Sequence, residues 1–195
     1  MKKMIQIVLG LGLSIALLAG CGDANQVPNS SQNENGENTE AIVVDDRGVP
    51  ALHFPVPAGF VLSEDSEGKD LYYTENYPDD MTNMIVRIYD YDEYGTDWTE
   101  ETFREQYEAG YEQAGTPISE LTYNKFEKGT LEGEFETLLI DYNILFGDDM
   151  YRQVEQLTQV GTRTYVQTYT QFGTEDTDYL KAFMDCVNAE SIVYE

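Results

Sequence analysis

The feature that most constrains the fold of this chain is a long stretch of β-strand signals joined by tight turns. Apolar residues alternate along one face of the first strand, at Leu138, Ile140, Tyr142, Ile144 and Phe146. Turn residues at 147–149 lead into a strand predicted over 151–160, and Gly161-Thr162 leads into another over 163–172. These three strands predict an antiparallel meander, and residues 118–128 predict a fourth strand in front of it.

Two segments with helical periodicity flank these strands. Between residues 99 and 113 aromatic side chains recur every four positions, at Phe103, Tyr107 and Tyr111. Between 176 and 188 apolar residues again share one helical face. Further short strands are expected at 51–63, 70–75, 84–91 and 191–194. The sequence therefore predicts an α+β fold in which helices flank an antiparallel β-sheet, as an α/β/α sandwich.

The N-terminal residues have the organisation of a bacterial lipoprotein signal. Two lysines precede an apolar stretch from Ile5 to Leu18, and small residues then lead to Cys21, whose thiol can accept a diacylglycerol. The stretch is shorter than the ~20 residues that a membrane-spanning helix needs. We expect residues 1–20 to be a signal peptide and Cys21 to carry the lipid, at the extracytoplasmic face of the cell membrane. An ordinary secretory signal or an N-terminal anchor is the alternative.

The rest of the chain divides into a tether and one domain. Residues 21–47 are polar and acidic, with little apolar surface to offset the entropy of ordering, so we expect a disordered tether. Residues 48–195 have the usual size of one domain and predict one core. With Cys21 lipidated, the second cysteine, Cys186, has no partner for an intrachain disulfide. We expect the domain to fold alone, as a monomer.

The formal net charge of −26 over 195 residues limits the partners of the protein. Such a polyanion is repelled by phosphate backbones and by anionic lipid headgroups, which argues against nucleic acid and against direct electrostatic docking on a membrane. The partners it favours are cations, basic proteins or neutral ligands of the envelope. The same acidity can also serve solubility alone.

The sequence predicts no catalytic residue and no cofactor. The single histidine, His53, lies in an apolar context before Pro55, and Cys186 shows the helical spacing of a buried residue, so a Cys-His pair is not indicated. There is no glycine-rich phosphate loop. The 37 acidic residues offer many carboxylates but single out no pair for glycoside hydrolysis. Most of the 15 tyrosines fall on strand or helix faces and predict packing.

One acidic segment, residues 90–101, partly matches a calcium-binding EF-hand loop. Four positions agree, at Asp90, Asp92, Gly95 and Glu101. Tyr94 replaces a ligand, Asp97 replaces an aliphatic residue, and a strand precedes the segment. One interpretation is a weak metal site with Asp90, Asp92 and Glu101 as ligands. The other is an acidic connection from a strand to a helix that Asp97 or Thr99 caps. Other acidic pairs, Asp79-Asp80 and Asp148-Asp149, are typical of turns.

The order of these elements resembles the PsbP-like superfamily, which includes extracytoplasmic lipoproteins of the LpqN and DcrB type. The parts that carry the resemblance are the Phe54 to Phe60 segment with its Pro and Gly, the strand at 84–88, the run 133–172 and the final helix followed by Ser191-Ile192. The resemblance covers most of residues 48–195. It implies an antiparallel sheet between helices, in a superfamily whose members mostly bind partners or assist assemblies, and it supplies no catalytic residue.

These observations predict a function class. We expect a membrane-anchored extracytoplasmic lipoprotein that acts as a binding or assembly-assisting module and not as an enzyme. The alternatives are a hydrolase acting on envelope glycans or peptides, and a weak cation-responsive module that uses residues 90–101.

Overall fold

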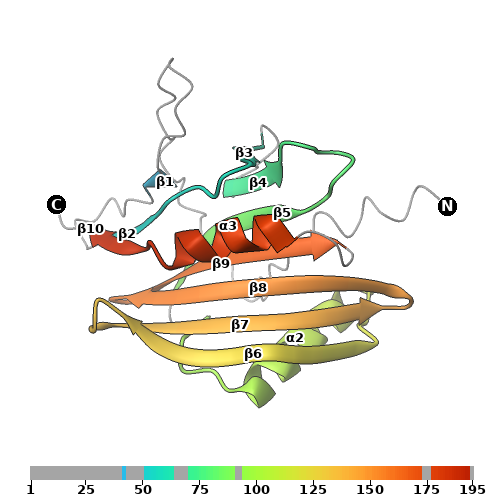
Figure 1. Ribbon diagram of the computed structural model, residues 1–195. Coiled ribbons are helices and arrows are strands. Elements are labelled where there is room, and N and C mark those ends of the chain that lie inside the picture. The colour runs from blue at the N-terminus through green and yellow to red at the C-terminus, as the bar shows by residue number, and fades with distance from the viewer. Residues whose placement is uncertain (1–40, 43–50, 64–69, 91–93, 173–176, 194–195) are drawn as a thin grey trace.

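The computed structural model describes residues 41–42, 51–63, 70–90, 94–172 and 177–193. Its main element is a seven-stranded antiparallel sheet (Figure 1). In chain order the strands are β3 (Phe60–Leu62), β4 (Asp70–Thr74), β5 (Asn83–Asp90), β6 (Glu120–Leu131), β7 (Phe135–Phe146), β8 (Asp149–Val160) and β9 (Arg163–Phe172). Their order across the sheet is β3-β4-β5-β9-β8-β7-β6. The meander of β7, β8 and β9 is therefore confirmed, with β6 as its fourth strand.

A smaller sheet lies beside the main one. It contains β1 (Ala41–Ile42), β2 (Ala51–Phe54) and β10 (Ser191–Val193), in the order β1-β2-β10. The sequence predicts one strand within 51–63, but the chain forms two, and they belong to different sheets. The prolines at 55 and 57 explain the division, because a proline cannot donate to a sheet ladder.

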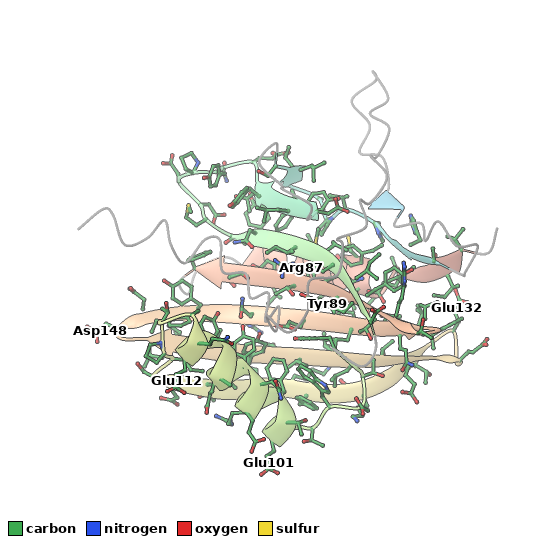
Figure 2. The ribbon with its side chains drawn as sticks, turned by 180° about the vertical axis from the view of Figure 1, so that it is seen from behind. Arg87, Tyr89, Glu101, Glu112, Glu132 and Asp148 are labelled. Atoms are coloured by element: carbon green, nitrogen blue, oxygen red, sulfur yellow. The ribbon has the colours of Figure 1, made fainter. Side chains whose placement is uncertain are left out.

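The two helices, α2 (Glu100–Gln113) and α3 (Thr177–Val187), cover opposite faces of the main sheet. In Figure 1, α3 lies in front of β9 and α2 lies behind β6, β7 and β8; Figure 2, from behind, brings α2 to the front. This arrangement confirms the predicted α+β class with helices flanking an antiparallel sheet. Within the described ranges, neither helix is long and apolar enough to cross a membrane.

The core differs from the sequence prediction, because the sheet divides it into two clusters. The cluster on the α3 side includes Phe54, Phe60, Met84, Tyr169 and Phe183. The cluster on the α2 side includes Phe103, Tyr107, Ile140, Tyr142 and Leu157. Successive side chains of a strand point to opposite faces, so a sheet covered on both sides buries two layers instead of the single predicted core.

Helix α2 is defined by its cap and by its aromatic face. Thr99 is the N-cap: its side chain accepts from the Thr102 backbone N–H, and the Thr102 side chain accepts from the Thr99 N–H in return. Of the two predicted capping residues, Thr99 is therefore the one used. The three aromatic residues spaced by four, Phe103, Tyr107 and Tyr111, are all buried against the sheet.

We predict that replacing Gly59 with Ala destabilises the domain. Gly59 has a φ of +84°, and a Cβ there would lie 2.7 Å from Cε1 of the Tyr179 ring on α3. Strain and collision together should lower the free energy of unfolding by roughly 1 to 3 kcal/mol in urea titrations.

Gly147 provides a matched control for this substitution. Its φ is +61°, but a Cβ there would meet nothing within 4 Å. Gly147→Ala should therefore lower the free energy of unfolding by less than Gly59→Ala, because it strains the backbone but brings the new Cβ into no contact. If both variants lose the same free energy of unfolding, the contact with Tyr179 does not contribute to the effect of Gly59→Ala.

Candidate functional site

A buried carboxylate lies on the α2 face of the sheet. Glu155 on β8 is 4% exposed. The Tyr94 hydroxyl donates to its Oε2 atom at 2.5 Å, and the Tyr142 hydroxyl donates to its Oε1 atom. Gln153, two residues earlier on the same face, accepts from the Tyr107 hydroxyl and donates to Thr170 Oγ1 at 2.9 Å. Each of these buried polar groups therefore has a hydrogen-bond partner within the cluster.

The electrostatics of this cluster favour neutral, protonated groups. Burial raises the pKa of Glu155, against hydrogen bonds from Tyr142 and Tyr94 and the charge of Arg87, which lower it. Burial and the neighbouring Glu155 raise the pKa of Tyr94 and of Tyr142 well above the ordinary value. The tyrosines therefore stay protonated as donors and are not activated as nucleophiles or bases.

The space beside Glu155 is too small for a substrate. A cavity of about 10 Å³ opens there, bordered by Arg87, Tyr89, Tyr94 and Thr168. Figure 2 shows Arg87 and Tyr89 from the side on which α2 lies. A volume of this size holds one water molecule at most.

A second buried carboxylate lies on the α3 face. Glu190, 7% exposed, follows α3 and precedes β10. Thr158 Oγ1 on β8 donates to it at 2.9 Å, and the Gln167 amide, oriented with its nitrogen toward Glu190, donates at 3.2 Å. Burial raises the pKa of Glu190 to about 8, against hydrogen bonds from Thr158 and Gln156 that lower it. Glu190 thus joins the connection between α3 and β10 to the main sheet.

The predicted metal ligands are placed only in part. Asp90 is exposed at the end of β5, Glu101 is exposed in the first turn of α2 (Figure 2), and Asp92 lies outside the described residues. Among those that are described, no group of three His, Cys, Asp or Glu side chains is arranged to hold a metal ion. The calcium interpretation stays a prediction.

Contacts on the C-terminal side of this segment tie it to the sheet. Tyr94, in the position of an EF-hand ligand, turns inward to Glu155. Thr96 is buried, and its hydroxyl lies within hydrogen-bond distance of Glu136 Oε2 (3.1 Å) and Gln159 Oε1 (3.2 Å). With Thr99 as the helix cap, the connection has a structural role of the kind that the second interpretation of the sequence predicts.

The remaining predicted residues are found in separate elements. Cys21, the predicted lipidation site, lies outside the described residues. His53 is on β2, opposite Ser191 of β10. Cys186 on α3 packs against the core, and burial raises the pKa of its thiol to about 11, with the Asp185 charge adding to the effect. A thiol with a raised pKa is a poor nucleophile at neutral pH.

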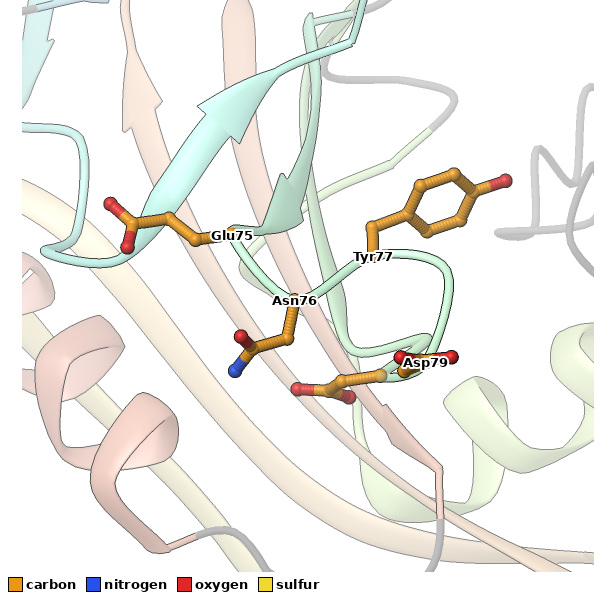
Figure 3. A pocket seen from close by; sticks show the side chains of 5 residues that line it. Glu75, Asn76, Tyr77 and Asp79 are labelled. Atoms are coloured by element: carbon orange, nitrogen blue, oxygen red, sulfur yellow. The ribbon is translucent and has the colours of Figure 1, made fainter.

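A surface hollow of about 580 Å³ lies at the turn between β4 and β5, lined by Glu75, Asn76, Tyr77, Asp79 and Asp80. In Figure 3, Glu75 and Tyr77 point to opposite sides of the turn, so the side chains do not converge on a ligand. Asp80 accepts from the Thr82 backbone N–H at 2.9 Å and from Thr74 Oγ1 at 3.2 Å. Asp79 and Asp148 lie in turns, as predicted, whereas Asp80 follows its turn and Asp149 begins β8.

Two features of the structure were not predicted from the sequence. Glu155 and Glu190 are buried carboxylates, and no local signal distinguished Glu155, because β8 also carries polar residues such as Gln153 and Gln156. Tyr77 is 47% exposed and its ring lies 4.2 Å from that of Tyr73, beside Val61, which is 54% exposed. Tyr77 is the one exposed aromatic side chain among the large exposed apolar residues in the described ranges.

We predict that Glu190→Gln flattens the pH dependence of stability. The folded pKa of about 8 lies above the ordinary 4.5, so the native state binds the proton more tightly than the unfolded chain. The free energy of unfolding therefore falls as the pH rises from about 5 to about 8, by at most about 1.4 kcal/mol per pH unit for one group. Glutamine cannot ionise and should remove that contribution.

Urea unfolding at several pH values tests this. Glu155, whose pKa is also raised, still contributes to the pH dependence of the free energy of unfolding in this variant. Glu105→Gln, at an exposed position on α2, is the control and should retain the wild-type slope. If Glu190→Gln and wild type show the same slope, Glu190 does not hold a proton in the folded state.

For the acidic segment 90–101, we predict calcium binding no tighter than ~0.1 to 1 mM, because Tyr94 is engaged with Glu155 and supplies no ligand. Calorimetric titration of wild type and Asp92→Asn at fixed ionic strength measures it. Magnesium should stabilise the acidic chain nearly as well, by screening. Micromolar calcium binding that Asp92→Asn abolishes would contradict the structural interpretation of this segment.

Comparison with known proteins identifies the fold. No protein-family model matches the chain, and no curated protein matches it. Among solved structures, cyanobacterial PsbP (CyanoP) from Synechocystis sp. PCC 6803 is similar with a TM-score of 0.55 and 18% identity, over 84% of this chain and 98% of that chain. LpqN from Mycobacterium tuberculosis, described as involved in cell envelope biogenesis, aligns with a TM-score of 0.44 and 18% identity, over 80% of this chain and 91% of that chain. The chain therefore has the PsbP-like fold that its sequence predicts.

Proposed function

We propose that the protein is a lipid-anchored binding or assembly-assisting module at the extracytoplasmic face of the cell membrane. The observation that carries the proposal is the motif that ends at Cys21, because a basic leader, an apolar stretch and small residues before a cysteine form the signal for lipid attachment. A diacylglycerol carries two acyl chains, which anchor a protein stably where a single chain is marginal.

The described part of the chain supports a binding role over catalysis. Its buried carboxylates, Glu155 and Glu190, are enclosed by hydrogen bonds to tyrosine, threonine and glutamine side chains. They lie in separate clusters, one toward α2 and one toward α3. A hydrolase of the glycosidase type needs two carboxylates flanking one substrate bond, which this arrangement does not offer.

The envelope hydrolase remains the alternative to test. Incubating the purified protein with cell-wall glycan and peptide fragments, followed by mass spectrometry of the products, should show no turnover. Turnover that Glu155→Gln abolishes would replace the binding proposal with an enzymatic one.

We predict that Cys21→Ala prevents lipidation and moves the protein out of the stably anchored membrane fraction. Metabolic labelling with a radioactive fatty acid and the intact mass of the product measure the modification. Cys186→Ala is the matched control, because it removes the other cysteine of the chain and should leave both labelling and fractionation unchanged. Labelling that persists in Cys21→Ala would contradict the proposed anchor.

A further inference from the structure

The two edges of the main sheet differ in how they are protected. The edge strand β6 carries Lys125, Glu127 and Lys128 and has a register shift between Tyr123 and Lys125. Charges and irregular pairing of this kind prevent another strand from adding to an edge. The other edge strand, β3, is Phe-Val-Leu, with no charge. Val61 is 54% exposed and Leu62 is 39% exposed.

The outer side of β3 offers backbone hydrogen-bonding groups. Glu75 donates its N–H to Gly59 O, and Ser63 donates its N–H to Leu71 O, so residues 59, 61 and 63 direct their backbone groups toward β4. Because bonded and non-bonded pairs alternate in an antiparallel ladder, Leu62 directs its N–H and C=O outward. Within the described ranges β3 is the terminal strand of its sheet, and no other strand pairs with that side.

An aromatic surface adjoins this edge. Val61 is paired with Tyr73 on β4, so both side chains lie on the same face, and the Tyr77 ring packs against the Tyr73 ring with their centroids 4.2 Å apart and their planes tilted by 30°. We call Val61, Tyr73 and Tyr77 the Tyr77 surface. Helix α2 lies over β6, β7 and β8 at the opposite end of the sheet and does not cover it (Figure 1).

The charges around this surface indicate what it binds. Glu75 and Asp79 are exposed in the same turn as Tyr77. Tyrosine rings and carboxylates both attract lysine and arginine side chains, and the net charge of −26 steers basic partners toward the chain. The same net charge opposes pairing of β3 with a second copy of this protein.

We propose that β3 and the Tyr77 surface dock an extended basic segment of another polypeptide. The segment pairs with the outer side of β3 as an eighth strand. Its backbone forms hydrogen bonds with the N–H and C=O of Leu62, and its cationic side chains contact the Tyr77 ring and Asp79. This inference names the partner class for the binding role proposed above. Its test is independent of the anchor, because it measures peptide affinity and not membrane attachment.

The probe is a fluorescent ten-residue peptide of alternating lysine and valine, titrated by anisotropy against the full-length protein in non-ionic detergent. We expect saturable binding that weakens as salt is added. The same peptide with every second amide N-methylated keeps its charge but cannot pair as a strand. Its affinity should be lower by roughly tenfold or more. An alternating glutamate and valine peptide should not bind.

Variants of the protein locate the site. Leu62→Pro removes the outward N–H, a change that an edge strand tolerates, and should weaken peptide binding roughly tenfold. Leu62→Ala keeps the N–H and should weaken peptide binding less. Tyr77→Ala should weaken binding as well. Met150→Ala is the control, because Met150 is 45% exposed on β8. Thermal melts report whether each variant is folded.

Several outcomes would overturn the proposal. Equal affinity for the plain and N-methylated peptides would exclude strand addition. Equal losses of peptide affinity in Tyr77→Ala and Met150→Ala would exclude the Tyr77 surface as part of the binding site. Self-association of the full-length protein that Leu62→Pro abolishes would make a second copy the occupant. If Leu62→Pro does not fold, the paired peptides and Tyr77→Ala still decide the result.

Discussion

The structure depends on one constraint: both faces of the long central strands have to be covered. On β7, Leu138, Ile140 and Tyr142 belong to the cluster under α2, whereas Val154 on β8 and Tyr169 on β9 belong to the cluster under α3. One helix covers one face of a sheet, so a sheet that is apolar on both sides needs two. The chain places α2 between β5 and β6 and α3 after β9, which brings one helix to each face (Figure 1).

That double coverage makes polar residues on the central strands costly, and it explains the hydrogen-bond clusters. Strand β8 is buried from Gln153 to Thr158, although four of these six residues are polar. An unpaired buried polar group loses its bonds to water without replacement. On the α2 face, tyrosine hydroxyls from Tyr94, Tyr107 and Tyr142 supply the partners. On the α3 face, Glu190 accepts from Thr158. Tyrosine suits this role because its ring fills apolar space while its hydroxyl donates.

The candidate sites were predictable to different degrees. The aromatic spacing of α2 predicted packing, and Phe103, Tyr107 and Tyr111 are buried. The segment 90–101 allowed two interpretations, since its acidic residues fit a cation loop while Thr99 fits a helix cap. Local sequence could not show that Tyr94 reaches Glu155, because 61 residues separate them and strand pairing brings them together. The position of β3 at the edge of the main sheet could not be predicted for a similar reason, since the sequence of a strand does not show whether another strand lies beside it.

The sequence by itself determined the strands of the meander, both helices and the α+β class, because alternation, helical periodicity and capping are properties of neighbouring residues. It also carried the motif that ends at Cys21, from which a lipid anchor is predicted. It did not show that residues 51–63 form two strands, nor that β1 lies within the predicted tether 21–47. The tertiary structure decided which strand lies at each edge, the division of the core into two layers, and the burial of Glu155 and Glu190. Those properties depend on which distant segments come into contact, and burial and pKa shifts follow from that contact and not from local pattern.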